Sequence, residues 1–359
     1  MRSRLRTSMI VPLVLAVSSA AFGWSHKEHA QFARLAAERL IADPSTPPEM
    51  KKWLEAACPK RFDMAGEEDY FLHKQIGLKP IEAFGPEHGV VHWVYMPDVR
   101  ALGDSQDAKV QPFNAHERLL HYIDLEYFLT GDTPRAYKDD LSAKPKLESI
   151  PDDVRDPRYV QAGFLPIRVE QCYNDFVKAI REKRFDNEEN NANYWAGYVA
   201  HYAADNTQPQ HATIDYKSQS YFKNPRKAPN VHAAIEYLMC DDEKLEHAEL
   251  RREFWPLFVK QLDEFKDPIQ TTEPFRATLE VANVSYDYLP LIGHAAAQAT
   301  APAGPNDKTD VLDVEKFFRY REPDNELRVM DMKARQTAWA VKRIERVWRQ
   351  AWDEATKDK

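Results

Sequence analysis

Two pairs of side chains, each an imidazole and a carboxylate four residues apart, give the sequence its clearest chemical signal. The first pair is His201 and Asp205, the second is His232 and Glu236, and His211 lies between the two pairs along the chain. A spacing of four returns an α-helix to nearly the same face, so the members of each pair point in one direction. Imidazole nitrogens and carboxylate oxygens are ligands that zinc prefers. The pattern therefore predicts a metal site.

Each pair taken singly has a simpler interpretation. A histidine and an acid at positions i and i+4 commonly form an ion pair on a solvated helix face. A buried histidine is more often a hydrogen-bonded core residue than a ligand. Two such pairs in one stretch of chain, with His211 between them and aromatic and asparagine residues leading into the first, favour the metal interpretation.

The elements that would position these residues are helices. Only 11 of the 359 residues are glycine, which favours helix over a turn-rich β architecture. Apolar spacing predicts helices over residues 26–40, 164–180, 191–205, 231–239, 246–264, 272–298 and 326–356, and another from a cap at Asn114 to Phe128. Residues 57–112 are less regular, and residues 130–158 have the composition of a surface loop. We expect an all-α, multi-helix, bundle-like fold.

The first 23 residues are typical of a secretory signal peptide. Three arginines within residues 1–6 precede an apolar run over Met9–Val17, and mostly small residues follow as far as Gly23. The apolar run is too short to span a bilayer. We expect cleavage before Trp24 and a secreted or periplasmic protein, with an uncleaved membrane anchor as the alternative. A free α-amine on Trp24 could bind metal once it is deprotonated.

Charge and cysteine content narrow the function classes. The formal net charge is −8, and loss of the three arginines would make it more negative. Such a chain has no general electrostatic attraction for nucleic acid, although bound cations could reverse the field inside a nuclease site. Cys58, Cys172 and Cys240 are odd in number and form no Cys-x-x-Cys pair. We therefore expect buried apolar cysteines rather than a disulfide framework or a thiolate metal site.

The central motif resembles that of a known family, which comprises the zinc-dependent phospholipases C and the fungal single-strand-specific zinc nucleases. The family motif His-aromatic-x-x-Asp-x-x-Gln-Pro-x-His stands here at residues 201–211 as HYAADNTQPQH. Trp24 and His29 are similar to the N-terminal tryptophan, which binds metal through its amine and carbonyl, and to the histidine that follows it. The resemblance covers roughly residues 24–240 and implies one shared helical fold.

Two further elements precede the central motif in the family. His121-Tyr122-Ile123-Asp124 resembles the one that supplies a histidine ligand followed by an aspartate. Pro97-Asp98-Val99-Arg100 resembles the one that supplies an aspartate ligand. Asp63 and Asp69 lie on the same side of His121 and remain alternatives to Asp98.

The resemblance implies about three zinc ions. The implied ligands are Trp24, His29 and Asp205 for one ion; Asp98, His121, His201 and the bridging Asp205 for the second; and His211, His232 and Glu236 for the third. A hydroxide shared by two of the ions would attack the phosphorus of a phosphodiester. The residues expected to act in catalysis are Asp205 and Asp124, the latter orienting water or a substrate group.

The expected function is therefore that of an exported, monomeric, zinc-dependent phosphodiester hydrolase of phospholipase C type. A single-strand-specific nuclease of the same fold, acting on DNA or RNA, is one alternative. A catalytically silent zinc-binding interaction protein is another. Lys27 stands where the choline-specific lipases carry an acid, which argues against phosphatidylcholine, whereas Glu236 is the acid found in the lipases.

Three segments describe the expected domain organisation. Residues 1–23 form the signal peptide, residues 24–300 the helical hydrolase-like domain, and residues 301–359 a proline-rich linker with a C-terminal amphipathic helix. Trp339, Trp348 and Trp352 lie on one stripe of that helix. The stripe could contact a membrane surface, although docking on the body of the protein is the expectation we favour.

Overall fold

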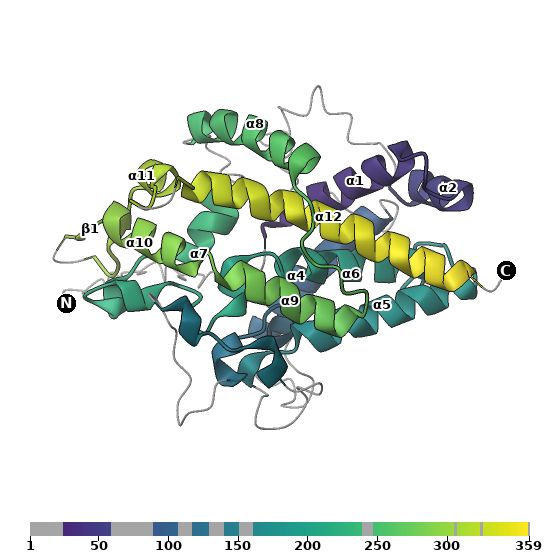
Figure 1. Cartoon of the computed structure of the whole chain (residues 1–359), viewed down its shortest axis with the longest axis horizontal. Coiled ribbons are helices and arrows are strands. Elements are labelled where there is room, and N and C mark those ends of the chain that lie inside the picture. Colours follow the sequence, from purple (N-terminus) through teal and green to yellow (C-terminus); the bar gives the residue numbers. More distant parts are fainter. Residues whose placement is uncertain are drawn as a thin grey trace, which may run out of the picture.

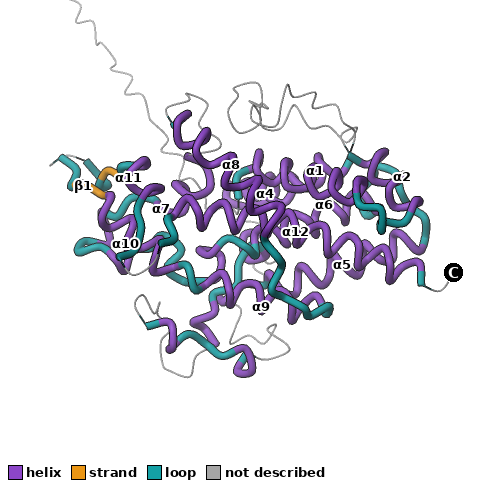
Figure 2. Tube along the Cα trace, turned by 45° about the horizontal axis from the view of Figure 1, so that its top comes forward, coloured by secondary structure: helices purple, strands orange, loops and turns teal. Residues whose placement is uncertain are grey.

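Nearly all of the regular structure is helical, which confirms the predicted all-α fold (Figures 1 and 2). The computed structural model describes residues 24–58, 89–106, 117–128, 140–150, 161–238, 247–304, 307–323 and 326–357. Its α-helices are α1 (His26–Ala42), α2 (Pro48–Ala57), α4 (Val90–Gln106), α5 (Leu165–Arg181), α6 (Ala192–Asp205), α7 (Val231–Ala233), α8 (Ala248–Glu264), α9 (Pro274–Tyr286), α10 (Leu289–Ala299), α11 (Val314–Arg319) and α12 (Val329–Thr356).

Shorter elements connect these helices. The 3₁₀-helices are Glu117–Leu120, Leu125–Phe128, Leu141–Ala143, Leu147–Ser149, Pro209–Ala212, Gln219–Tyr221 and Pro225–Lys227. A π-helical turn, Ala234–Leu238, continues α7. The strands β1 (Thr300–Ala301) and β2 (Val311–Leu312) pair antiparallel beside α11 (Figure 2).

Helix α6 is the centre of the molecule. All 14 of its residues are buried, and it packs against α4, α5, α12 and α1. Its sequence explains this, because small residues alternate with Tyr194, Tyr198 and Tyr202 and few side chains favour water. The last turn of α6 carries His201 and Asp205, so the fold places the strongest sequence motif in its interior.

Helix α4 approaches α6 so closely that only glycine fits at the crossing. A Cβ on Gly197 would lie 2.5 Å from Trp93 Cβ and 2.6 Å from the backbone nitrogen of Val94. Because Asp98 follows one turn later on α4, this close approach also sets the distance between Asp98 and the end of α6.

Gly197→Ala is expected to destabilise the fold. The added methyl group would force α4 and α6 apart, and we expect the free energy of unfolding to fall by about 1–3 kcal/mol. Urea denaturation measures this change. Gly304→Ala is a matched control, because a Cβ there meets only the carboxylate of Asp307. A Gly197→Ala variant as stable as the wild type would contradict the close packing described here.

Helix α12 crosses the middle of the molecule and packs against α8, α6, α1 and α5 (Figure 1). Trp339, Trp348 and Trp352 are all buried. The apolar stripe of α12 therefore docks on the body of the protein, as we favoured from the sequence. Among the described residues, no helix combines the length and the apolar character needed to cross a bilayer.

The structure differs from the predicted helices in three regions, and α2 and α11 are two further helices that were not predicted. Residues 90–106, expected to be irregular, form α4 with Pro97 inside it. The prediction of one helix from Asn114 to Phe128 is wrong for the described residues 117–128, where two short 3₁₀-helices flank a non-helical stretch. Asn114 itself lies outside the described residues. The pattern over residues 272–298 forms two helices, α9 and α10.

The cysteine prediction holds for two of the three cysteines. Cys58 and Cys172 are buried free thiols, and burial raises the pKa of each to about 12. Cys240 lies outside the described residues.

Candidate metal centre

Eight of the predicted ligands come together in the interior. They form three groups in which one nitrogen or oxygen from each residue lies within 4.8 Å of the others: His29, Asp98 and His201; His121, His201 and Asp205; and His211, His232 and Glu236. Every one of these residues is buried. A solvated helix-face pair, the simpler interpretation of the spacing, is therefore wrong for both His201–Asp205 and His232–Glu236.

Asp205 belongs to the second group and also contacts His29 of the first. Its Oδ1 lies 3.0 Å from His29 Nε2, and its Oδ2 lies 3.2 Å from His201 Nε2 and 2.9 Å from His121 Nδ1. These histidines come from α1, from α6 and from the non-helical stretch after Leu120. The rings of His29 and His201 stack with their centroids 3.9 Å apart. One carboxylate thus faces three imidazoles from three separate segments.

Asp98 approaches the same cluster from α4. Its Oδ1 lies 3.7 Å from His201 Nε2, and its side chain is fully buried. The two alternatives weighed from the sequence, Asp63 and Asp69, lie outside the described residues. The three groups differ from the zinc ligand sets that the family resemblance implies. His201 is common to the first two groups in the structure, whereas the implied sets share Asp205.

The third group joins the segment after α6 to the turn after α7. His211 Nε2 lies 3.3 Å from His232 Nε2 and 3.5 Å from Glu236 Oε1, and His232 Nε2 also contacts that oxygen. Glu236 stands in the π-helical turn, an element found frequently at functional sites. This group contains the three ligands that the sequence assigned together.

Backbone carbonyls orient two of the histidines. His201 Nδ1 donates to Val94 O at 2.8 Å, and His211 Nδ1 donates to His121 O at 2.6 Å. A neutral imidazole that donates from Nδ1 carries its lone pair on Nε2, and in both residues Nε2 points into a ligand group. Metal-binding histidines are usually held in this way.

The donor set fits a divalent cation. His29 Nδ1 and Glu236 Oε2 are buried and have no hydrogen bond. His29 Nε2 faces Asp205 Oδ1 at 3.0 Å. Buried acceptors that face one another are costly unless a positive charge lies among them. Imidazole and carboxylate ligands suit zinc and other transition metals. The three groups could therefore hold metal ions, and their chemistry excludes a thiolate site at these residues.

Burial and neighbouring charges set the protonation of the ligands. Burial, aided by the nearby His201, lowers the pKa of His29 to about 4, so its imidazole is neutral at pH 7. Burial also lowers the pKa of His211. Burial would lower the pKa of His201 too, but nearby carboxylates, Asp205 foremost, raise it to about 9. Burial raises the pKa of Glu236 well above its usual range.

Metal binding is expected to release protons and to weaken as the pH falls. In the metal-free protein His201 holds a proton at pH 7, because nearby carboxylates outweigh burial and raise its pKa to about 9, and a cation must displace this proton. The raised pKa of Glu236 acts in the same direction. Each displaced proton weakens the apparent Kd about tenfold for each unit of pH below the pKa of its group. Competition with a chromophoric chelator between pH 6 and pH 8 measures the effect, and a constant Kd over that range would contradict it.

Trp24 is fixed beside the cluster through its side chain. The ring is fully buried, and its Nε1 donates to Ala204 O at 3.0 Å and to Thr207 Oγ1 at 3.2 Å. Ser25 caps α1 in a reciprocal capping box with Glu28, which places His29 in the first turns of the helix. The predicted cleavage point involves Gly23, which lies outside the described residues.

Asp124 belongs to none of the three groups. Burial, with the nearby Glu126, raises its pKa well above the usual range, which favours the protonated form. Burial, and after it the charge of Asp124, raises the pKa of Tyr122. A protonated carboxyl can donate a hydrogen bond, which suits the expected role of orienting a substrate group.

Sequence reasoning missed two residues that support the third group. Glu126 accepts hydrogen bonds from Thr213 Oγ1 at 2.6 Å and from the Ile214 nitrogen at 3.1 Å, and so holds the segment after His211. Gln208 Nε2 donates to Glu236 Oε1 at 3.2 Å. Gln208 lies within the motif at residues 201–211, and this position could have indicated its role. Nothing in the sequence around Glu126 distinguishes it from other glutamates.

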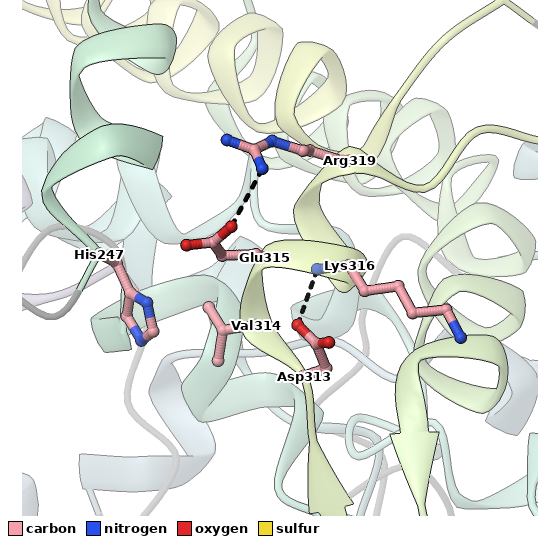
Figure 3. Close-up of a pocket in the computed structure, with 6 residues that line it drawn as sticks. All are labelled: His247, Asp313, Val314, Glu315, Lys316 and Arg319. Atoms are coloured by element: carbon pink, nitrogen blue, oxygen red, sulfur yellow. Dashed lines mark hydrogen bonds and ion pairs between the residues drawn. The ribbon is translucent and has the colours of Figure 1, made fainter.

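An open hollow of about 510 Å³ lies away from these groups (Figure 3). His247 and residues 313–316 and 319 line it, and none of these belongs to the three groups. Arg319 pairs with Glu315 at 3.0 Å, and the carboxylate of Asp313 caps α11 by accepting from the Lys316 backbone nitrogen at 2.9 Å. The hollow is therefore not part of the candidate metal centre.

Comparison of the chain with protein-family models, with curated proteins and with solved structures gives no match.

Proposed function

We propose that this chain is a phosphodiester hydrolase that works with bound zinc ions. The observation that carries the proposal is the convergence of eight buried imidazoles and carboxylates in three adjoining groups. Ions bound there would neutralise the charge of a phosphate diester and lower the pKa of a water molecule, which could then act as the nucleophile. The resemblance of residues 201–211 to the phospholipase C and nuclease family supports this reaction class.

The side chains have distinct parts in the proposed reaction. Asp205 holds its two oxygens towards three histidines, so its charge would balance more than one cation. Asp124, whose raised pKa favours the protonated form, would donate a hydrogen bond to a substrate oxygen. Trp24 would contribute its α-amine and carbonyl as ligands after cleavage of an export signal, and the protein would then act outside the cytoplasm.

The first candidate substrate is a phospholipid. The acid of the third group is Glu236, as in the lipases of the resembled family, and the acidic chain has no general attraction for nucleic acid. The completeness of the ligand groups favours an enzyme over a silent zinc-binding protein.

Single-stranded nucleic acid is a second candidate substrate, favoured by two residues that lie near His232 of the third group. Tyr216 is 38% exposed and stands edge-on to His232 with ring centroids 5.5 Å apart. The ammonium group of Lys217 lies 5.2 Å from the Tyr216 ring. An exposed aromatic ring beside a cation is the combination that stacks a base and attracts its phosphate.

Separate incubations of the zinc-loaded protein with single-stranded DNA, RNA and mixed phospholipid vesicles test the proposal. We expect cleavage of one class, with loss of the activity in the Asp205→Asn variant. Release of phosphorylated headgroups identifies a phospholipase C, and release of nucleotides identifies a nuclease. No cleavage of any of the three substrates by protein that contains zinc would overturn the proposed function.

A further inference from the structure

Helix α12 brings a fully buried lysine to the back of the candidate metal centre. Lys333 Nζ lies 2.8 Å from Glu28 Oε1, and neither side chain has any exposed surface. Burying an ion pair generally contributes little net stability, because both charges lose their hydration. A role other than stabilisation is therefore needed to explain this pair.

The contacts of Lys333 join segments that carry ligands of different groups. Glu28 directly precedes His29, and its other carboxylate oxygen accepts from the Ser25 nitrogen at 3.3 Å, which completes the cap of α1. Lys333 Nζ also donates to the carbonyl oxygen of Ile235, the residue before Glu236.

Two further contacts extend this connection. Lys333 Nζ lies 5.0 Å from the centroid of the Trp24 ring. One turn further along α12, Gln336 Nε2 donates to Thr207 O at 2.6 Å, within the segment between Asp205 and His211. Helix α12 thus touches three of the segments that supply ligands.

We propose that Lys333 is a positioning residue, whose ammonium group fixes the start of α1, with His29, relative to the turn that carries Glu236. This inference rests on the proposed metal centre and extends it to the C-terminal region, which the family resemblance does not cover. Removing the ammonium group would leave the Ile235 carbonyl without this donor and would release the two ends of the centre from each other.

The decisive variant replaces both charges at once. Lys333→Met alone leaves Glu28 buried without its cation and could fail to fold, whereas Lys333→Met with Glu28→Gln leaves no unpaired buried charge. Glutamine at position 28 can still complete the capping box of α1. We expect this double variant to keep the melting temperature of the metal-free wild type but to bind zinc about 10- to 100-fold more weakly, as is typical when groups that orient ligands are lost.

Arg343→Met is the matched control. Arg343 is a second buried cation of α12, and it pairs with Asp267 at 2.9 Å, far along the helix from the ligand segments. We expect this variant to lower the melting temperature without changing zinc affinity. Equal zinc affinity in the double variant and the wild type, or an equal loss in Arg343→Met, would overturn the positioning role. A wild type that binds no zinc would overturn both the inference and the proposed function, whereas a wild type that binds zinc without cleaving phosphodiesters would overturn the proposed function alone.

Discussion

Asp205→Asn is expected to abolish phosphodiester cleavage and to lower the metal content by more than one ion. Asp205 faces His29, His121 and His201 within 3.2 Å, so the loss of its charge disturbs two of the three groups. Substitution of groups that merely orient ligands costs about 10- to 100-fold, so we expect the loss at a shared ligand to exceed 100-fold. Asparagine keeps the shape and removes the charge that balances the cations.

Asp215→Asn is the control for this change. Asp215 lies outside the three groups, and its carboxylate accepts from the nitrogens of Gln219 and Ser220 at 2.7 and 3.0 Å. An amide oxygen can keep one of these bonds, so activity and zinc content should stay at wild-type levels. Equal activity of Asp205→Asn and the wild type at saturating zinc would show that the central motif is structural.

Removal of metal by a chelator is expected to lower the melting temperature by several degrees. An ion present at a thousand times its Kd stabilises the folded state by about 4 kcal/mol. The structural reason is the set of buried acceptors that face one another, such as His211 Nε2 and His232 Nε2 at 3.3 Å. Differential scanning calorimetry before and after treatment, and again after zinc is restored, measures the change.

The Asp205→Asn variant provides the comparison for that experiment. It should contain fewer ions, so the chelator should lower its melting temperature by less than that of the wild type. If the melting temperature of the wild type does not change with chelator or with added zinc, the three groups do not bind metal with useful affinity.

Much of the fold could be predicted because its helices have strong local signals. The structure places α1, α5, α6 and α12 within a few residues of their expected bounds, since each combines an apolar face with a clear end. Helix α4 escaped prediction because Pro97 interrupts its pattern and tertiary packing against α6 overrides that break. The stretch around His121 was wrongly expected to be an α-helix, because the spacing of its leucines and isoleucine is typical of one face of a helix. In the structure two 3₁₀-helices carry these leucines, and the isoleucine lies between them.

In the candidate site, too, the residues with a local sequence signal could be predicted and those brought in by tertiary packing could not. The i,i+4 pairs and the quoted motif predicted which residues would meet, because spacing on a helix is a local property. Lys333 could not be predicted, since nothing local distinguishes a buried lysine from the solvated lysines and arginines of an amphipathic helix. Glu126 was missed for the same reason, as its partners Thr213 and Tyr286 are far from it in the sequence.

Elemental analysis of the protein, purified without chelators, measures directly whether the three groups hold metal ions. We expect about three zinc ions per chain, with a loss of more than one in the Asp205→Asn variant. A wild-type protein that contains no zinc, and that takes up none on dialysis against a zinc solution, would show that the three groups are not zinc sites.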